Sequence, residues 1–134
     1  MFKIVIDTNI WVSYFIGKKT LELTELILDN DLEVLTSETL IKELNEVLNR
    51  PKFAKYLNSP IHEYLQIHLQ LCVLKDVEPF FVGSPDPKDN FLFDLSIQEH
   101  ASYLVTCDKK LFEIGEIKGL TLISLSEFKT LLNS

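Results

Sequence analysis

The chain has 134 residues, a formal net charge of −7 and 46% hydrophobic residues. This length predicts one domain over residues 1–134, because two domains would each be too small to bury a stable core. The apolar content excludes a disordered or fibrous chain. The excess of 20 acidic over 13 basic residues argues against nucleic-acid binding through a broad basic surface, but it is compatible with carboxylates gathered into one site.

No targeting or membrane-spanning segment is recognisable in the sequence. The N-terminal apolar run stops at Asp7, too early for the core of a signal peptide or for a membrane span. The two cysteines, Cys72 and Cys107, form no metal-binding pair, which predicts reduced thiols in the core. We therefore expect a soluble, cytoplasmic protein with no membrane partner.

Short apolar runs alternate with helical patterns along the chain. Strands are predicted at residues 2–6, 32–35, 104–107 and 120–124. Helices are predicted after Asn9, at 37–49, at 60–74, from 86 onward and after 124, with a loop at 77–85. This alternation predicts an α/β fold with a parallel sheet.

Three of the predicted helices carry start signals. The helix over 37–49 shows an amphipathic spacing behind Thr36 or Ser37 as its cap. Asp86-Pro87 places an N-cap Asp before a Pro at the first helical position, and residues 124–127 fit a capping box.

Two carboxylates directly follow predicted strands. Asp7 comes after the first strand, and Asp108 follows the strand that ends near Cys107. Ligands of parallel sheets bind outside the carboxyl ends of the strands, so the two acids are expected at one sheet edge. Either Asp alone is more typical of a turn or a helix cap, whereas the pair favours a site.

The helix over 37–49 adds a third carboxylate. Glu43 lies beside Val47, at the border of the apolar stripe, where its side chain can reach a strand end. Glu46 lies further round the helix and is predicted to face solvent. Glu43 alone would also fit a solvated surface position.

Asp89 is the fourth candidate, three residues after the cap Asp86. An acid in the first turn is also stabilised by the helix dipole, which is a purely structural explanation. Capping already accounts for Asp86, and Asp94 lies roughly on the other side of the helix, so both are second-tier candidates.

Converging carboxylates repel one another unless divalent cations neutralise them. Oxygen-only ligands select hard ions such as Mg²⁺ or Mn²⁺, which activate water and stabilise charge on phosphate oxygens. The predicted metal-binding and catalytic set is Asp7, Glu43, Asp89 and Asp108. No catalytic His is needed, and structural or surface positions are expected for His62, His68 and His100.

Four segments, in this order, resemble the motifs of PIN-domain ribonucleases. Residues 4–9 read as an apolar strand followed by Asp, Thr and Asn, and residues 40–48 carry a helical Glu. Residues 86–92 match the third motif, and residues 104–111 are similar to the fourth. The ordered set runs from residue 2 to about 128 and looks most like the small, single-domain toxin-type members of bacterial or archaeal toxin–antitoxin pairs.

The resemblance implies a three-layer α/β/α fold with a central parallel sheet of four or five strands. It also implies metal-dependent cleavage of RNA. It maps Asp7, Glu43 and Asp89 onto metal-binding acids and Asp108 onto a fourth acid of the pocket. Asn9 matches a family Asn that orders the site by hydrogen bonding, and Thr106 matches a Ser or Thr near the metal.

The expected partners follow from the same resemblance. They are an RNA substrate, a protein antitoxin and a second copy of the chain. Aromatic residues of the first helix, Trp11, Tyr14 and Phe15, lie where toxin-type relatives form dimers, although their spacing is equally typical of a core. Basic residues are few, and weak phosphate contacts are predicted at Lys52, Lys55, Lys109 and Lys110.

Two alternatives stay open on the sequence. A Mg²⁺-dependent phosphoryl-transfer domain of the receiver or haloacid-dehalogenase type also places an Asp after its first strand. The dehalogenase pattern needs a second Asp where this chain has Asn9, and the receiver pattern leaves Glu43 unexplained. The other alternative is a non-catalytic PIN-fold binding module, against which the complete set of acids argues.

Overall fold

The computed structural model describes residues 2–117 and 119–133. The strands are β1 (Lys3–Ile6), β2 (Glu33–Thr36), β3 (Cys72–Leu74), β4 (Tyr103–Val105) and β5 (Thr121–Ile123). The α-helices are α1 (Thr8–Ile16), α2 (Thr20–Asp29), α3 (Glu38–Leu48), α4 (Ile61–Leu71), α5 (Asn90–Gln98) and α6 (Leu125–Leu132). Short 3₁₀ helices form η1 (Pro51–Tyr56), η2 (Pro87–Asp89) and η3 (Lys109–Ile114).

The strands form one five-stranded parallel sheet in the order β3-β2-β1-β4-β5. At its centre, Val5 pairs with Leu35 on one side and with Leu104 on the other. All three side chains are buried, as expected for apolar strands covered on both faces. The prediction of a parallel α/β sheet is confirmed.

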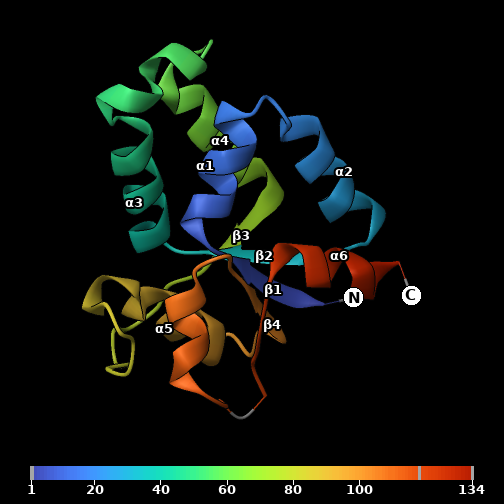
Figure 1. Cartoon of the computed structure of the whole chain (residues 1–134), viewed down its shortest axis with the longest axis vertical. Helices are drawn as coiled ribbons and strands as arrows, with labels where there is room; N and C mark the ends of the chain where they lie inside the picture. The colour runs from blue at the N-terminus through green and yellow to red at the C-terminus, as the bar shows by residue number, and fades with distance from the viewer. Residues whose placement is uncertain (1, 118, 134) are drawn as a thin grey trace.

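Helices cover both faces of the sheet and form the three predicted layers. Side chains alternate along β1, so that Ile4 and Ile6 pack in a core with α1, α2, α3 and α6. Val5 points the other way and packs with Leu92 and Leu95 of α5. Figure 1 shows α1 to α4 on one side of the sheet and α5 on the other.

One predicted helix is too long. The helix expected over 60–74 ends at Leu71, and Cys72–Leu74 forms the edge strand β3. This strand is held by pairing with β2 over Val34, Leu35 and Thr36. Three residues are too few to show a strand periodicity, and the stabilising partner lies far away in the sequence.

The local start signals act largely as expected. The Ser37 hydroxyl accepts the Leu40 N–H at 3.3 Å, and the Ser124 hydroxyl accepts the Glu127 N–H at 3.2 Å as the cap of α6. The Glu127 carboxylate accepts from the Ser124 hydroxyl at 2.9 Å, rather than from the backbone N–H that a capping box would use. The helix opened by Asp86-Pro87 differs in one respect. It begins as the 3₁₀ turn η2 and becomes α-helical only at Asn90.

The aromatic residues of α1 belong to the core. Trp11, Tyr14 and Phe15 are 0%, 6% and 1% exposed. Phe15 packs against Tyr64 of α4, with ring centroids 5.1 Å apart. These three side chains therefore pack within the chain, and their burial leaves little of their surface for a contact between two copies.

A buried histidine joins α4 to the sheet. His68 is fully buried, its Nε2 lies 2.8 Å from the Thr36 hydroxyl, and its ring packs edge-on against Trp11. Burial lowers the pKa of His68 to about 4. Of the three histidines, His68 is thus structural, whereas His62 and His100 are exposed.

The low pKa of His68 predicts an acid-sensitive fold. Between about pH 6.5 and 4 the unfolded chain binds a proton at His68 that the folded chain excludes, so stability falls as the pH is lowered through this window. The contribution is about 3 kcal/mol at most. In urea unfolding across this range, the free energy of unfolding should depend less on pH in His68→Gln than in the parent. An equal pH dependence in the two proteins would contradict a buried, neutral His68.

Candidate active site

Asp7 lies at the carboxyl end of β1 and is tied to the neighbouring strand. Its backbone N–H donates to the Val105 carbonyl of β4 at 2.9 Å. Its side chain is 6% exposed, and Oδ2 accepts a hydrogen bond of 2.7 Å from the Thr106 hydroxyl. The carboxylate is therefore oriented by a residue far from it in sequence, as expected for two strand ends meeting at one sheet edge.

Thr106 also connects Asp7 to Asp108. The buried Thr106 hydroxyl accepts the Asp108 N–H at 3.1 Å while it donates to Asp7. Asp108 caps η3, since its Oδ1 accepts the Lys110 N–H at 3.0 Å. Asp108 therefore both caps η3 and lies near Asp7.

Glu43 projects from α3 toward the residue that follows Asp7. Its Oε2 accepts a hydrogen bond of 2.6 Å from the hydroxyl of Thr8, which is 1% exposed. Sequence reasoning placed Glu43 beside the buried face of α3 but assigned no role to Thr8. The sequence signal that could have identified Thr8 is that a residue with a hydroxyl group directly follows Asp7 in the first motif.

Asp89 closes η2 and is the acid most strongly affected by the others. Burial raises its pKa first, and the negative charges of Asp7, Asp86, Glu43 and Asp108 raise it further, to about 6. Such mutual repulsion requires these side chains to share one region of the molecule. The structure therefore brings the four acids predicted from the sequence to one end of the sheet.

The same repulsion acts on the other members of the cluster. The pKa of Asp7 is raised by burial, with a smaller contribution from Asp108. The pKa of Glu43 is raised by burial and by Asp7, while its hydrogen bond from Thr8 and the charge of Arg50 oppose the shift. The cluster is thus a region of unbalanced negative charge.

The carboxylates do not form a closed cage. Within the described residues, no three His, Cys, Asp or Glu side chains are close enough together to form a ready-made coordination site. Mg²⁺ typically keeps several waters and uses one or two protein carboxylates, so an open cluster of oxygen donors is compatible with this ion. Carboxylates without His or Cys also match a hard cation by ligand type.

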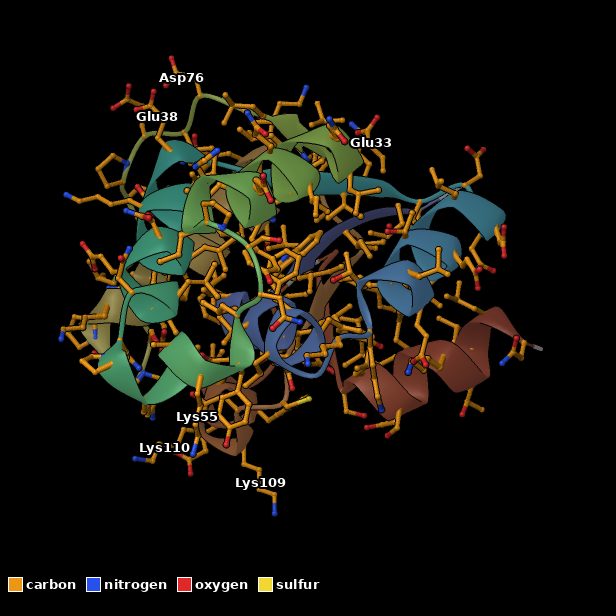
Figure 2. All side chains as sticks on the ribbon, turned by 90° about the horizontal axis from the view of Figure 1, so that it is seen from above. Glu33, Glu38, Lys55, Asp76, Lys109 and Lys110 are labelled. Carbon is orange, nitrogen blue, oxygen red and sulfur yellow. The ribbon has the colours of Figure 1, made fainter. Side chains whose placement is uncertain are left out.

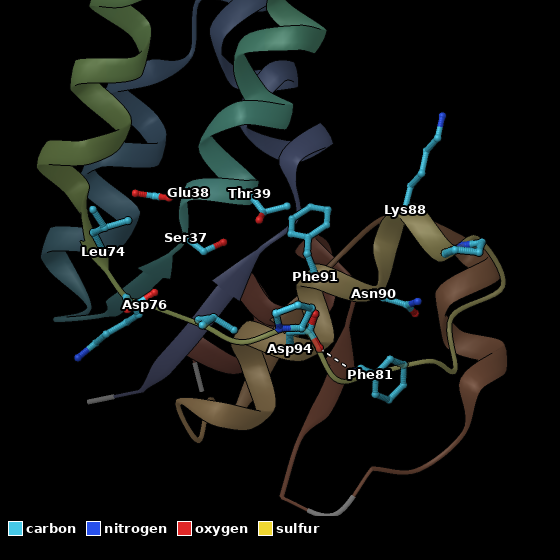
Figure 3. A pocket seen from close by; sticks show the side chains of 14 residues that line it. Ser37, Glu38, Thr39, Leu74, Asp76, Phe81, Lys88, Asn90, Phe91 and Asp94 are labelled. Atoms are coloured by element: carbon cyan, nitrogen blue, oxygen red, sulfur yellow. Dashed lines mark hydrogen bonds between the residues drawn. The ribbon is translucent and has the colours of Figure 1, made fainter.

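The two second-tier acids have structural roles. Asp86 is exposed and caps η2 by accepting the Lys88 N–H at 3.0 Å. Asp94 is buried in α5, and its Oδ1 accepts the N–H groups of Phe80 and Phe81 at 3.0 and 2.7 Å. Asp94 therefore anchors the loop before η2, as the dashed line in Figure 3 shows for Phe81.

A groove of about 720 Å³ lies beside the cluster, between the start of α3, the segment after β3 and the start of α5 (Figure 3). None of the four predicted acids lines this groove. Its lining includes the carboxylates of Glu38, Asp76 and Asp94. Lys75 and Lys88 line it as well, so its charged residues leave a small negative excess that disfavours a phosphate chain.

The predicted supporting residues occupy different positions. Thr106 contacts Asp7 directly, whereas Asn9 is exposed and makes no side-chain hydrogen bond with the described part of the chain. The four predicted phosphate contacts lie on the 3₁₀ helices η1 and η3: Lys52, Lys55, Lys109 and Lys110. In Figure 2, Lys55, Lys109 and Lys110 gather at one edge, opposite Glu38 and Asp76.

Cys107, between Thr106 and Asp108, is exposed rather than part of the core, and Cys72 is half-buried. Both are free thiols.

Comparison with known families identifies the fold. A family model described as PIN domain matches residues 3–110. The chain belongs to the PIN-domain family. PIN domains are generally nucleases, and the matched region contains all four acids.

No significant match was found among curated proteins or among solved structures. Of the helices in the described residues, none is long and apolar enough to cross a membrane.

The electrostatic coupling in this PIN domain is directly measurable. In an Asp7→Asn variant the pKa of Asp89 should fall below about 6, because one of the charges that raise it is removed. Asp29→Asn, an exposed change in α2, is the matched control and should leave the pKa of Asp89 unchanged. NMR titration of the Asp89 carboxyl carbon measures this pKa in both variants. An equal pKa of Asp89 in Asp7→Asn and in the parent would contradict a shared site.

Proposed function

We propose that this PIN domain is a Mg²⁺- or Mn²⁺-dependent endoribonuclease that hydrolyses RNA phosphodiester bonds. The observation that supports this most is the raised pKa of Asp89, which results from burial and from the negative charges of Asp7, Glu43 and Asp108, together with Asp86, near its carboxyl. Carboxylates are held in such repulsive proximity at functional sites far more often than elsewhere. RNA is the substrate class that the resemblance of the four motifs implies.

The chain offers a donor set for the cation. Asp7, Glu43 and Asp89 would hold one ion, and Asp108 would complete the acidic pocket. A bound Mg²⁺ or Mn²⁺ would supply charge stabilisation at the phosphate oxygens and activation of water. The negative charge shared by the four acids favours cation binding and disfavours approach of RNA to the metal-free protein.

Two buried hydroxyls orient this donor set. Thr106 donates to Asp7 and Thr8 donates to Glu43, so one oxygen of each carboxylate is fixed in place. These hydrogen bonds favour the ionised forms and offset part of the desolvation that raises both pKa values. Asp7 and Glu43 therefore serve as positioned anionic ligands.

Asp89 is the candidate ligand whose proton a cation would displace. In the metal-free protein, burial and the surrounding carboxylates raise its pKa to about 6, so part of its carboxyl is protonated near that pH. A cation bound to Asp89 would displace that proton and keep the carboxylate ionised.

The sheet order bears on the phosphoryl-transfer alternative. Receiver-type domains have the flavodoxin-like order 2-1-3-4-5. This chain has the order β3-β2-β1-β4-β5, with its first strand in the centre. The receiver-type reading is therefore disfavoured by topology as well as by the helical Glu43.

We also propose that the nuclease is the toxin of a toxin–antitoxin pair, with a protein antitoxin and a homodimeric state. This proposal rests on the similarity of the four ordered motifs to those of the small toxin-type members. Growth arrest on expression of the chain, relieved by the product of an adjacent short reading frame, is the expected result. Arrest that persists in Asp7→Asn would contradict a toxic nuclease activity.

Cleavage assays with a matched pair of substitutions test the nuclease proposal. Glu43→Gln should reduce the cleavage rate of single-stranded RNA by about 100-fold or more, because a ligand that stabilises transition-state charge is lost. Glu46→Gln, an exposed change on the same helix, should retain the parent rate. Chelation of divalent ions should abolish cleavage in both.

Equal rates for Glu43→Gln and the parent would refute the assigned site. The binding-module alternative is examined separately by calorimetric Mn²⁺ titration of the parent and Asp7→Asn. Heat of binding in the parent alone supports a cation site, and absence of heat in both supports a module without metal chemistry.

A further inference from the structure

A second groove shares no lining residue with the one in Figure 3. It has a volume of about 760 Å³ and runs between α1, the start of α6 and Tyr56 at the end of η1. We call it the α1–α6 groove. Pockets that hold small ligands typically measure roughly 300–1,000 Å³, so this groove has room for a nucleotide.

The inner end of the α1–α6 groove adjoins the acidic cluster through the chain itself. Asn9 lines the groove two residues after Asp7. Cys107 also lines it and stands between Thr106 and Asp108. The groove therefore begins one residue from Asp108 and two residues from Asp7 along the chain, so an RNA strand whose phosphate reaches the acids would have a short way to it.

The groove combines an aromatic surface with cations. Tyr56 lines it with 43% of its surface exposed, and the Lys55 ammonium lies 5.1 Å from the centre of the Tyr56 ring. Lys19 and Lys129 line the groove as well, with Lys129 placed 5.6 Å from the centre of the Tyr14 ring. Glu22 is the one carboxylate among its lining residues.

The two grooves differ in charge. The groove of Figure 3 has three carboxylates in its lining, and one of its lysines, Lys75, lies 3.6 Å from Glu99 in an ion pair. The Figure 3 groove thus has three carboxylates against the two lysines Lys75 and Lys88, whereas the α1–α6 groove has two lysines against one carboxylate. The balance of charge therefore favours a phosphate chain in the second groove over the first.

We propose that the α1–α6 groove binds a nucleotide of single-stranded RNA that flanks the phosphate to be cleaved. Its base stacks on Tyr56, and its phosphates lie near Lys19 and Lys129. This inference rests on the nuclease function proposed above and adds the path of the substrate. Stacking on a protein ring requires an unpaired base, which is why the substrate in this groove is single-stranded.

The exposed thiol of Cys107 provides a reporter of occupancy. Cys107 lines the groove, whereas burial raises the pKa of Cys72 and keeps that thiol unreactive. A short single-stranded RNA of random sequence, added to the parent protein with Ca²⁺ in place of Mg²⁺, should slow alkylation of Cys107 several-fold. A duplex of the same length should protect much less.

Substitutions in the parent identify the contacts by fluorescence anisotropy with the same RNA in the presence of Ca²⁺. Tyr56→Ala should weaken binding about tenfold, and Tyr56→Phe should retain affinity, because stacking needs the ring and not the hydroxyl. Replacement of both Lys19 and Lys129 by Gln should reduce the slope of log affinity against log salt by about 1.4, or about 0.7 per contact. Lys3→Gln, at the opposite end of β1, is the control and should leave the slope unchanged.

The outcomes separate this inference from the proposed function. RNA cleavage by the parent without protection of Cys107, or with Tyr56→Ala binding as the parent does, overturns the groove assignment and leaves the nuclease intact. Protection of Cys107 without any cleavage by the parent supports the groove and refutes the nuclease. Protection that appears without RNA and grows with protein concentration shows a second copy in the groove and also overturns the proposal.

Discussion

The hydrogen bond from the Thr106 hydroxyl to Asp7 is the contact on which the site depends. It measures 2.7 Å, is buried, and joins the residues that follow the central strand β1 and its neighbour β4. Because the same hydroxyl accepts the Asp108 N–H, one side chain sets the positions of two acids. A hydrogen bond to a charged group contributes about 1.5–3 kcal/mol, enough to offset part of the desolvation of Asp7.

The sheet thus holds carboxylates in an arrangement that their mutual repulsion opposes. Asp7 and Glu43 are each held by a buried hydroxyl, whereas the Asp89 side chain accepts no hydrogen bond from the described residues and has a pKa of about 6. This difference divides the cluster into anchored ligands and one group able to exchange a proton near neutral pH. Part of the net charge of −7 is thus concentrated at the acids that would bind a cation.

Periodic and local features were predictable from the sequence, and non-local ones were not. The amphipathic spacing of α3 predicted the border position of Glu43 and a cap at Thr36 or Ser37, of which Ser37 is the cap. The apolar run of β1 predicted Asp7 at a sheet edge. The edge strand β3 was missed because only pairing with β2 makes Cys72–Leu74 extended. The anchoring of a loop by Asp94 was equally invisible, because its partners are backbone N–H groups more than ten residues away.

Proton release on cation binding tests the central claim most directly. At pH 6 the Asp89 carboxyl is about half protonated, and a cation bound among the acids displaces that proton. Calorimetric titration of Mn²⁺ at pH 6, in buffers of different ionisation enthalpy, should therefore show release of about half a proton or more per ion. Release should decline toward zero at higher pH, and Asp89→Asn should release less. Cation binding without proton release at pH 6, or with equal release in Asp89→Asn, would contradict a cation site built around Asp89.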